Sequence, residues 1–88
     1  MHQMKLKNCL SYKKTLYREV AGRVRYYSFK VYPTLFNEYI LVREYGSIKN
    51  KKPTRVINTY FSKLDELVVS MESILAAKIY KGYLGSSF

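Results

Sequence analysis

The sequence RVRYYSFKVY occupies residues 23–32 and alternates in polarity along its length. Tyr27, Phe29 and Val31 fall on one face of an extended chain, and more polar side chains fall on the other. Because successive side chains of a strand point to opposite faces, this pattern predicts a strand with one buried face. Arg25 has the parity of the apolar face but lies near the start of the strand.

Three more stretches have the composition of strands, which are rich in β-branched and aromatic residues. They are residues 14–20, the sequence EYILVREY at 38–45, which the next glycine ends, and RVINTYF at 55–61. Ala21-Gly22-Arg23 is a plausible turn after the first of them. The segment 47–54 is polar and basic, so we expect a loop there.

Residues 63–80 have the sequence signals of a helix. Ser62, followed three residues later by Asp65, resembles a capping box, and Gly82 fits the position just after a helix. Apolar side chains recur at helical spacing through this segment. They are Leu64, Leu67, Val68, Met71, Ile74, Leu75 and Ile79.

A length of 88 residues fits one domain. Four strands followed by a helix predict an α+β fold, in which one C-terminal helix packs across one face of an antiparallel sheet of four or more strands. We expect the domain to span residues 13–83, with flexible ends at 1–12 and 84–88. We recognise neither a membrane span nor a signal peptide in this sequence, so we expect a cytoplasmic protein without a membrane partner.

The residues needed for most catalytic and metal sites are missing. Cys9 and His2 are each the only residue of their type, and no glycine-rich phosphate loop is present. The six acidic residues are scattered, and three of them belong to the predicted helix. We therefore expect no enzymatic activity, no cofactor and no metal.

The formal net charge is +10, from 16 basic and 6 acidic residues, and the excess lies in the first two thirds of the chain. Basic residues there alternate with tyrosines, and Tyr39, Arg43 and Tyr45 share one strand face. Phosphates attract cations and unpaired bases stack on flat rings, so this pattern favours nucleic-acid binding. The expected phosphate contacts are Arg25, Lys30, Arg43, Lys49, Lys51, Lys52 and Arg55.

The order and spacing of several pieces resemble the WGR domain. The pieces are YYSFKVY at 26–32, YILVREYGSI at 39–48, YFS at 60–62 before an acidic helix, and KGY at 81–83. The match covers about residues 20–83. The resemblance implies an antiparallel sheet crossed by one helix, nucleic-acid binding and no catalysis. WGR domains occur in DNA-dependent poly(ADP-ribose) polymerases and in short bacterial proteins, so it also implies a bacterial protein and DNA rather than RNA.

Three residues depart from the family motif. Tyr45 replaces the motif Trp, and Ser47 replaces the motif Arg. Lys49 replaces the Gly that usually follows the position of Ile48. By position, Tyr45 and Gly46 inherit a role in nucleic-acid binding, with the Tyr45 ring stacking on a base or sugar. Ser47 inherits none.

The sequence therefore predicts a non-catalytic nucleic-acid-binding module that uses a basic, tyrosine-rich sheet edge and loop, as a monomer or weak dimer. The alternative is a protein–protein interaction adaptor or a self-associating module that binds an acidic partner. Tyr and Arg are favoured at interface centres, and an exposed edge at the first strand could pair with a second copy.

Overall fold

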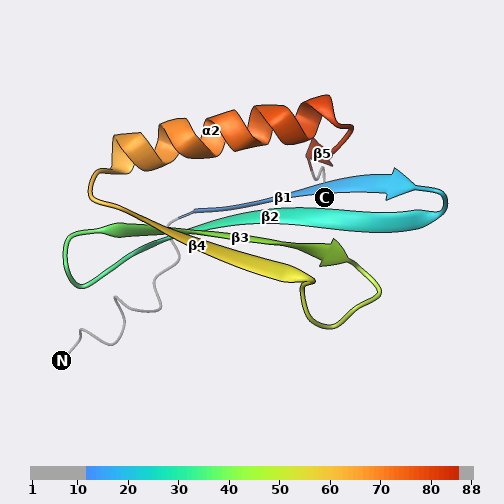
Figure 1. Cartoon of the computed structure of the whole chain (residues 1–88), viewed down its shortest axis with the longest axis horizontal. Coiled ribbons are helices and arrows are strands. Elements are labelled where there is room, and N and C mark those ends of the chain that lie inside the picture. Colours follow the sequence, from blue (N-terminus) through green and yellow to red (C-terminus); the bar gives the residue numbers. More distant parts are fainter. Residues whose placement is uncertain (1–11, 86–88) are drawn as a thin grey trace.

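Four strands follow one another as an antiparallel meander in the structure, a computed structural model that describes residues 12–85 (Figure 1). A helix then crosses one face of the sheet, and a fifth, two-residue strand follows it. The strand order is β4-β3-β2-β1-β5, so the predicted α+β architecture is confirmed. The elements are β1 (Tyr12–Val20), β2 (Arg23–Pro33), β3 (Tyr39–Ser47), β4 (Arg55–Phe61), α2 (Leu64–Tyr80) and β5 (Leu84–Gly85).

Short turns set the strand register. Ala21 and Gly22 have φ angles of 54° and 80°, the two positive values of a type I′ hairpin turn, and Val20 pairs with Arg23 across it. Between β2 and β3, the Thr34 hydroxyl accepts hydrogen bonds from the N–H groups of Phe36 (3.1 Å) and Glu38 (3.3 Å). β3 continues to Ser47 instead of ending before Gly46, because Gly46 still pairs with Tyr26.

The core lies between the sheet and α2. Tyr27, Phe29 and Val31 are buried on the face that α2 covers, as their alternation predicts. Strand pairing places Leu16 beside Tyr27 and Leu41 beside Val31, and α2 contributes Leu67 and Met71. We call the other side of the sheet the open face, since no described element covers it.

The buried stripe of α2 differs in phase from the predicted one. Leu67 and Met71 are buried and Ile74 and Leu75 are partly buried, but Leu64 and Ile79 are 45% and 51% exposed. The helix also lacks the predicted capping box. Its N-cap is Lys63, which makes no side-chain cap hydrogen bond, and the Asp65 carboxylate accepts from the N–H of Glu66 instead.

The C-terminal end of α2 is closed by a Schellman motif. The N–H of Tyr83 donates to the carbonyl of Lys78 and that of Gly82 to the carbonyl of Ile79, both at 3.0 Å. Gly82 has φ 107°, as expected of its cap position. The motif reverses the chain, buries Tyr83 and pairs β5 with Leu16 and Tyr17 of β1.

Parts of both expected flexible ends belong to the sheet. Tyr12 belongs to β1, and Leu84 and Gly85 form β5. The rest of those expected ends, residues 1–11 and 86–88, lies outside the described residues. Over residues 12–85, no helix is long and apolar enough to cross a membrane.

Candidate nucleic-acid interface

Basic side chains gather at one end of the molecule. The β1–β2 turn, the β3–β4 loop and the C-terminal end of α2 all lie at this end, on the right in Figure 1. We call this set the basic end. Its members are Arg18, Arg23, Arg25, Arg43, Lys49, Lys51, Lys52, Arg55, Lys78 and Lys81.

At the centre of the basic end, two cations contact one tyrosine. Lys78 Nζ lies 4.5 Å from the centroid of the Tyr27 ring, and Arg43 Nη1 donates to the Tyr27 hydroxyl at 3.2 Å. Arg18 Cζ lies 6.0 Å from the centroid of the Tyr83 ring, and Tyr83 itself packs edge-on against Tyr27. These contacts hold cations from three elements around a small aromatic cluster.

Among residues 12–85, no carboxylate forms a salt bridge with this cluster. Within residues 12–85 the one salt bridge is between Lys30 and Glu44, which are not part of the basic end. Partial burial lowers the pKa of Lys78, and the positive charges of Lys81 and Arg43 lower it further. In addition, Arg43 Nε is buried without a hydrogen-bond partner. An anion bound here would relieve the repulsion between these cations.

Tyr45 lies on the helix-covered face of β3. Its ring is half-buried and stacks on Tyr27, with centroids 5.2 Å apart and planes 8° apart. Arg55 of β4 is its direct cross-strand neighbour. A core residue, Tyr27, therefore covers one face of the Tyr45 ring, whether or not a ligand also contacts Tyr45.

Gly46 has a structural role in the β3–β4 loop. A Cβ atom at this position would lie 2.8 Å from the backbone nitrogen of Thr54 and 3.0 Å from its hydroxyl oxygen. The Thr54 N–H donates to the Tyr45 carbonyl at 2.8 Å. Glycine thus lets the end of the loop that carries the lysines approach β3 closely.

The lysines of this loop are fully available to a ligand. Lys49, Lys51 and Lys52 are exposed, as is Arg55 at the start of β4. Ser47 anchors the loop: its hydroxyl accepts from the N–H of Lys49 (3.3 Å) and its carbonyl accepts from the N–H of Asn50 (3.1 Å). Ser47, which inherits no role from the motif, therefore organises the loop that carries the cations.

The structure divides the expected site residues between two faces. Arg25, Arg43, Tyr45 and Arg55 share the helix-covered face, with the loop lysines at the same end. Lys30 points to the open face, where its ammonium contacts Glu44 at 3.3 Å. Lys30 is thus separated from the others by the sheet.

Four members of the basic end are absent from the contacts predicted from the sequence: Arg18, Arg23, Lys78 and Lys81. Arg18 could be found by strand parity, since it pairs directly with Arg25. Lys78 and Lys81 carry only the signal of basic residues near a helix C-terminus. The approach of Lys78 to Tyr27 depends on the direction in which α2 crosses the sheet, which local sequence does not specify.

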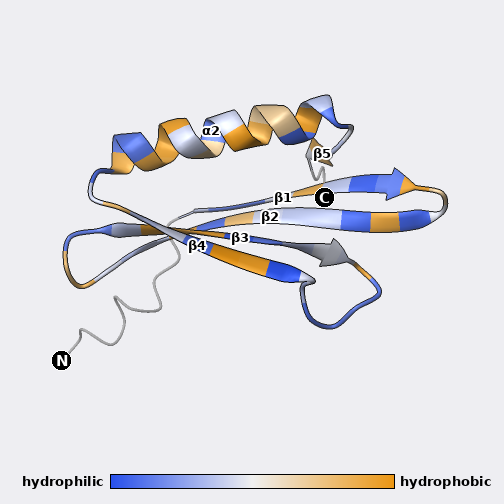
Figure 2. Cartoon of the chain, viewed as in Figure 1, coloured by the Kyte–Doolittle hydropathy of each residue, from blue (hydrophilic) through white to orange (hydrophobic). Residues whose placement is uncertain are grey.

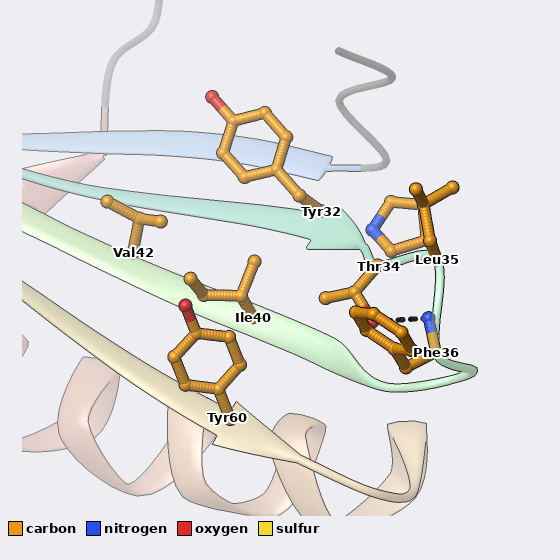
Figure 3. Close-up of a pocket in the computed structure, with 8 residues that line it drawn as sticks. Tyr32, Thr34, Leu35, Phe36, Ile40, Val42 and Tyr60 are labelled. Atoms are coloured by element: carbon orange, nitrogen blue, oxygen red, sulfur yellow. Dashed lines mark hydrogen bonds between the residues drawn. The ribbon is translucent and has the colours of Figure 1, made fainter. Parts of the chain in front are cut away.

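The open face has a different chemistry. A hollow of about 560 Å³ lies between Tyr32 of β2, Ile40 and Val42 of β3 and Tyr60 of β4, with Leu35 and Phe36 at one end (Figure 3). Its lining is uncharged. Among residues 12–85, no cluster of His, Cys, Asp and Glu could hold a metal ion.

Comparisons of the chain with protein-family models, with curated proteins and with solved structures found no match.

Proposed function

We propose that the protein is a WGR-like module that binds nucleic acid through its basic end. One observation carries the proposal: ten basic side chains from separate strands, a loop and a helix end gather in one region. The acidic residues on the same strands are Glu19 and Glu44, and Glu44 is paired with Lys30 on the open face. A surface of this kind attracts a polyanion by counterion release.

The cluster around Tyr27 supports a phosphate contact in particular. Lys81 and Arg43 each repel the charged form of Lys78, and Lys78 is partly desolvated, so the free protein keeps these charges together at a cost. A phosphate would offset that cost and supply an acceptor for a charge-assisted hydrogen bond. We retain DNA as the expected ligand, because the WGR resemblance implies it.

Fluorescence anisotropy with labelled duplex, nicked and single-stranded DNA, and with single-stranded RNA, tests the proposal. If five to eight cations contact phosphate, log affinity falls with log salt at a slope of roughly −4 to −7. The double variant Lys51→Gln/Lys52→Gln should reduce the magnitude of this slope by about 2. A flat salt dependence would contradict the proposal.

A charge-matched control separates a defined surface from general attraction. Lys13 and Lys63 are exposed, at the start of β1 and just before α2, away from the basic end. Lys13→Gln/Lys63→Gln removes the same two charges and should leave the slope nearly unchanged. Equal losses in both double variants would mean only that a cationic protein meets a polyanion, and the basic end would not be the interface.

A further inference from the structure

β4 is an edge strand of the sheet, and no element of residues 12–85 pairs with its outer side. It pairs only with β3 among the described residues, and this pairing runs from Arg55 to Phe61 without a bulge. The segment Val56–Phe61 contains neither a charged residue nor a proline. Natural proteins usually guard an exposed edge with charges, prolines, bulges or a covering segment, because its free backbone groups can pair with another strand.

The opposite edge of the sheet is protected in two of these ways. β5 covers the middle of β1 at Leu16 and Tyr17. The rest of β1 is rich in charge, with Lys13 and Lys14 before this point and Arg18 and Glu19 after it. Among residues 12–85, β1 is therefore the protected edge of the sheet and β4 the unprotected one. The sequence suggested the first strand as the exposed edge instead.

We propose that β4 pairs antiparallel with β4 of a second copy, with the two Asn58 residues opposite each other on a two-fold axis. In this register Ile57 lies opposite Thr59, Val56 opposite Tyr60 and Arg55 opposite Phe61. No like charges lie opposite each other among these paired residues. The contact is isologous, so it closes as a dimer and does not propagate.

The charges at the two ends of β4 favour this orientation. β4 begins at Arg55, next to the loop that carries Lys51 and Lys52, and it leads into the first turn of α2, which carries Asp65 and Glu66. Antiparallel pairing places the acidic turn of one copy beside the basic loop of the other. It also places the two basic ends at opposite ends of the dimer, which limits their repulsion.

The exposed apolar residues of β4 also favour pairing with a second copy. Val56 and Tyr60 face the open side and are 48% and 62% exposed, and the apolar stretch of β4 stands out in Figure 2. Tyr60 forms one wall of the open-face hollow (Figure 3). Pairing brings Val56 of one copy against Tyr60 of the other, so the hollow continues across the junction and both side chains lose exposure to water.

Sedimentation velocity over a concentration series, without nucleic acid, tests the dimer. We expect the wild-type protein to shift from monomer to dimer as concentration rises. Asn58→Lys places two ammonium groups together on the axis and should keep the protein monomeric, with an unchanged circular dichroism spectrum. Ser73→Lys adds the same charge on the exposed side of α2 and should dimerise as the wild type does.

Cysteine crosslinking tests the register in a Cys9→Ser background. Asn58→Cys brings two thiols together on the axis, so a short bis-maleimide should link the copies. Val56→Cys places the two thiols about 14 Å apart and should not crosslink. A wild type that stays monomeric at every concentration, an Asn58→Lys variant that still dimerises, or preferential crosslinking through Val56→Cys would overturn the proposal.

Discussion

Gly46 shapes the candidate interface through its lack of a side chain. The Thr54 N–H can reach the Tyr45 carbonyl only because nothing projects from Gly46 between the loop and β3. This close approach closes the base of the loop that carries the lysines. The position thus matters to the interface through backbone geometry, independently of any contact that a ligand makes.

We expect Gly46→Ala to lower the free energy of unfolding by about 1–3 kcal/mol, because the new Cβ forces the Thr54 backbone to move. Urea denaturation measures the change. Gly85→Ala is the control: its Cβ would lie 3.9 Å from Leu16 Cδ2, an ordinary contact, and should change the stability by less than about 0.5 kcal/mol. Equal stabilities of Gly46→Ala and the wild type would contradict the close approach.

Lys78 should titrate below the ordinary lysine value of 10.5, first because it is partly buried and then because Lys81 and Arg43 are near. Lys81→Gln removes one of these charges and should raise the Lys78 pKa, but not fully, since burial persists. NMR titration of the lysine Cε signals measures both values, with Lys78→Arg for assignment. An identical Lys78 pKa in the two proteins would contradict the charge repulsion between Lys81 and Lys78.

The pH dependence of stability follows from the same shift. The folded state holds the Lys78 pKa below its unfolded value, so the unfolded chain binds more protons between the two. The contribution of Lys78 to stability therefore rises with pH through this window and levels off above the ordinary lysine pKa of 10.5. Below the lowered pKa, the destabilising effect of the charged form is fully present.

The helix α2 meets the sheet along a stripe that the apolar spacing alone does not locate. Leu64 and Ile79 fit the 3.6-residue period but lie near the two ends of α2, where both are about half exposed. The equivalent place near the C-terminal end of the helix is taken by Lys78, whose stem crosses the helix–sheet boundary and whose ammonium lies over Tyr27.

Two alanine substitutions on α2 distinguish these positions. Leu67→Ala removes a fully buried side chain and should lower the free energy of unfolding by about 2–5 kcal/mol. Ile79→Ala, at a half-exposed position on the same helix, should cost less than about 1 kcal/mol. Thermal or urea unfolding measures both variants. Comparable losses would mean that Ile79 packs in the core as its spacing suggests.

The main elements could be predicted because their signals are local. Alternation in residues 23–32 and helical spacing in 63–80 need no knowledge of the rest of the chain. β5 could not be predicted, because two residues have no period and their pairing depends on the turn at Gly82. The absent capping box has a similar cause, since a suitable Ser62–Asp65 spacing does not make Ser62 adopt the N-cap position.

For the whole molecule, strand parity predicted that Arg43 and Tyr45 share a face, but Lys30, which was expected in the same interface, lies on the other face. Parity could not show that α2 brings Lys78 to the same place, because this depends on tertiary packing. It also could not show which edge of the sheet is open. If both proposals hold, a dimer would present two basic ends that point in opposite directions along one continuous sheet.

The pairing of β5 with β1 also constrains the order of folding. Leu16 and Gly85 are far apart in sequence, whereas β1 to β4 are joined by short links. Contacts between distant residues form late, because a long loop must close first. During synthesis on a ribosome, the sheet can begin to assemble behind the growing end. The packing of Tyr27 cannot be completed until its neighbour Tyr83 has been synthesised. A nascent chain halted before Tyr83 would therefore expose an incomplete core to chaperones and proteases.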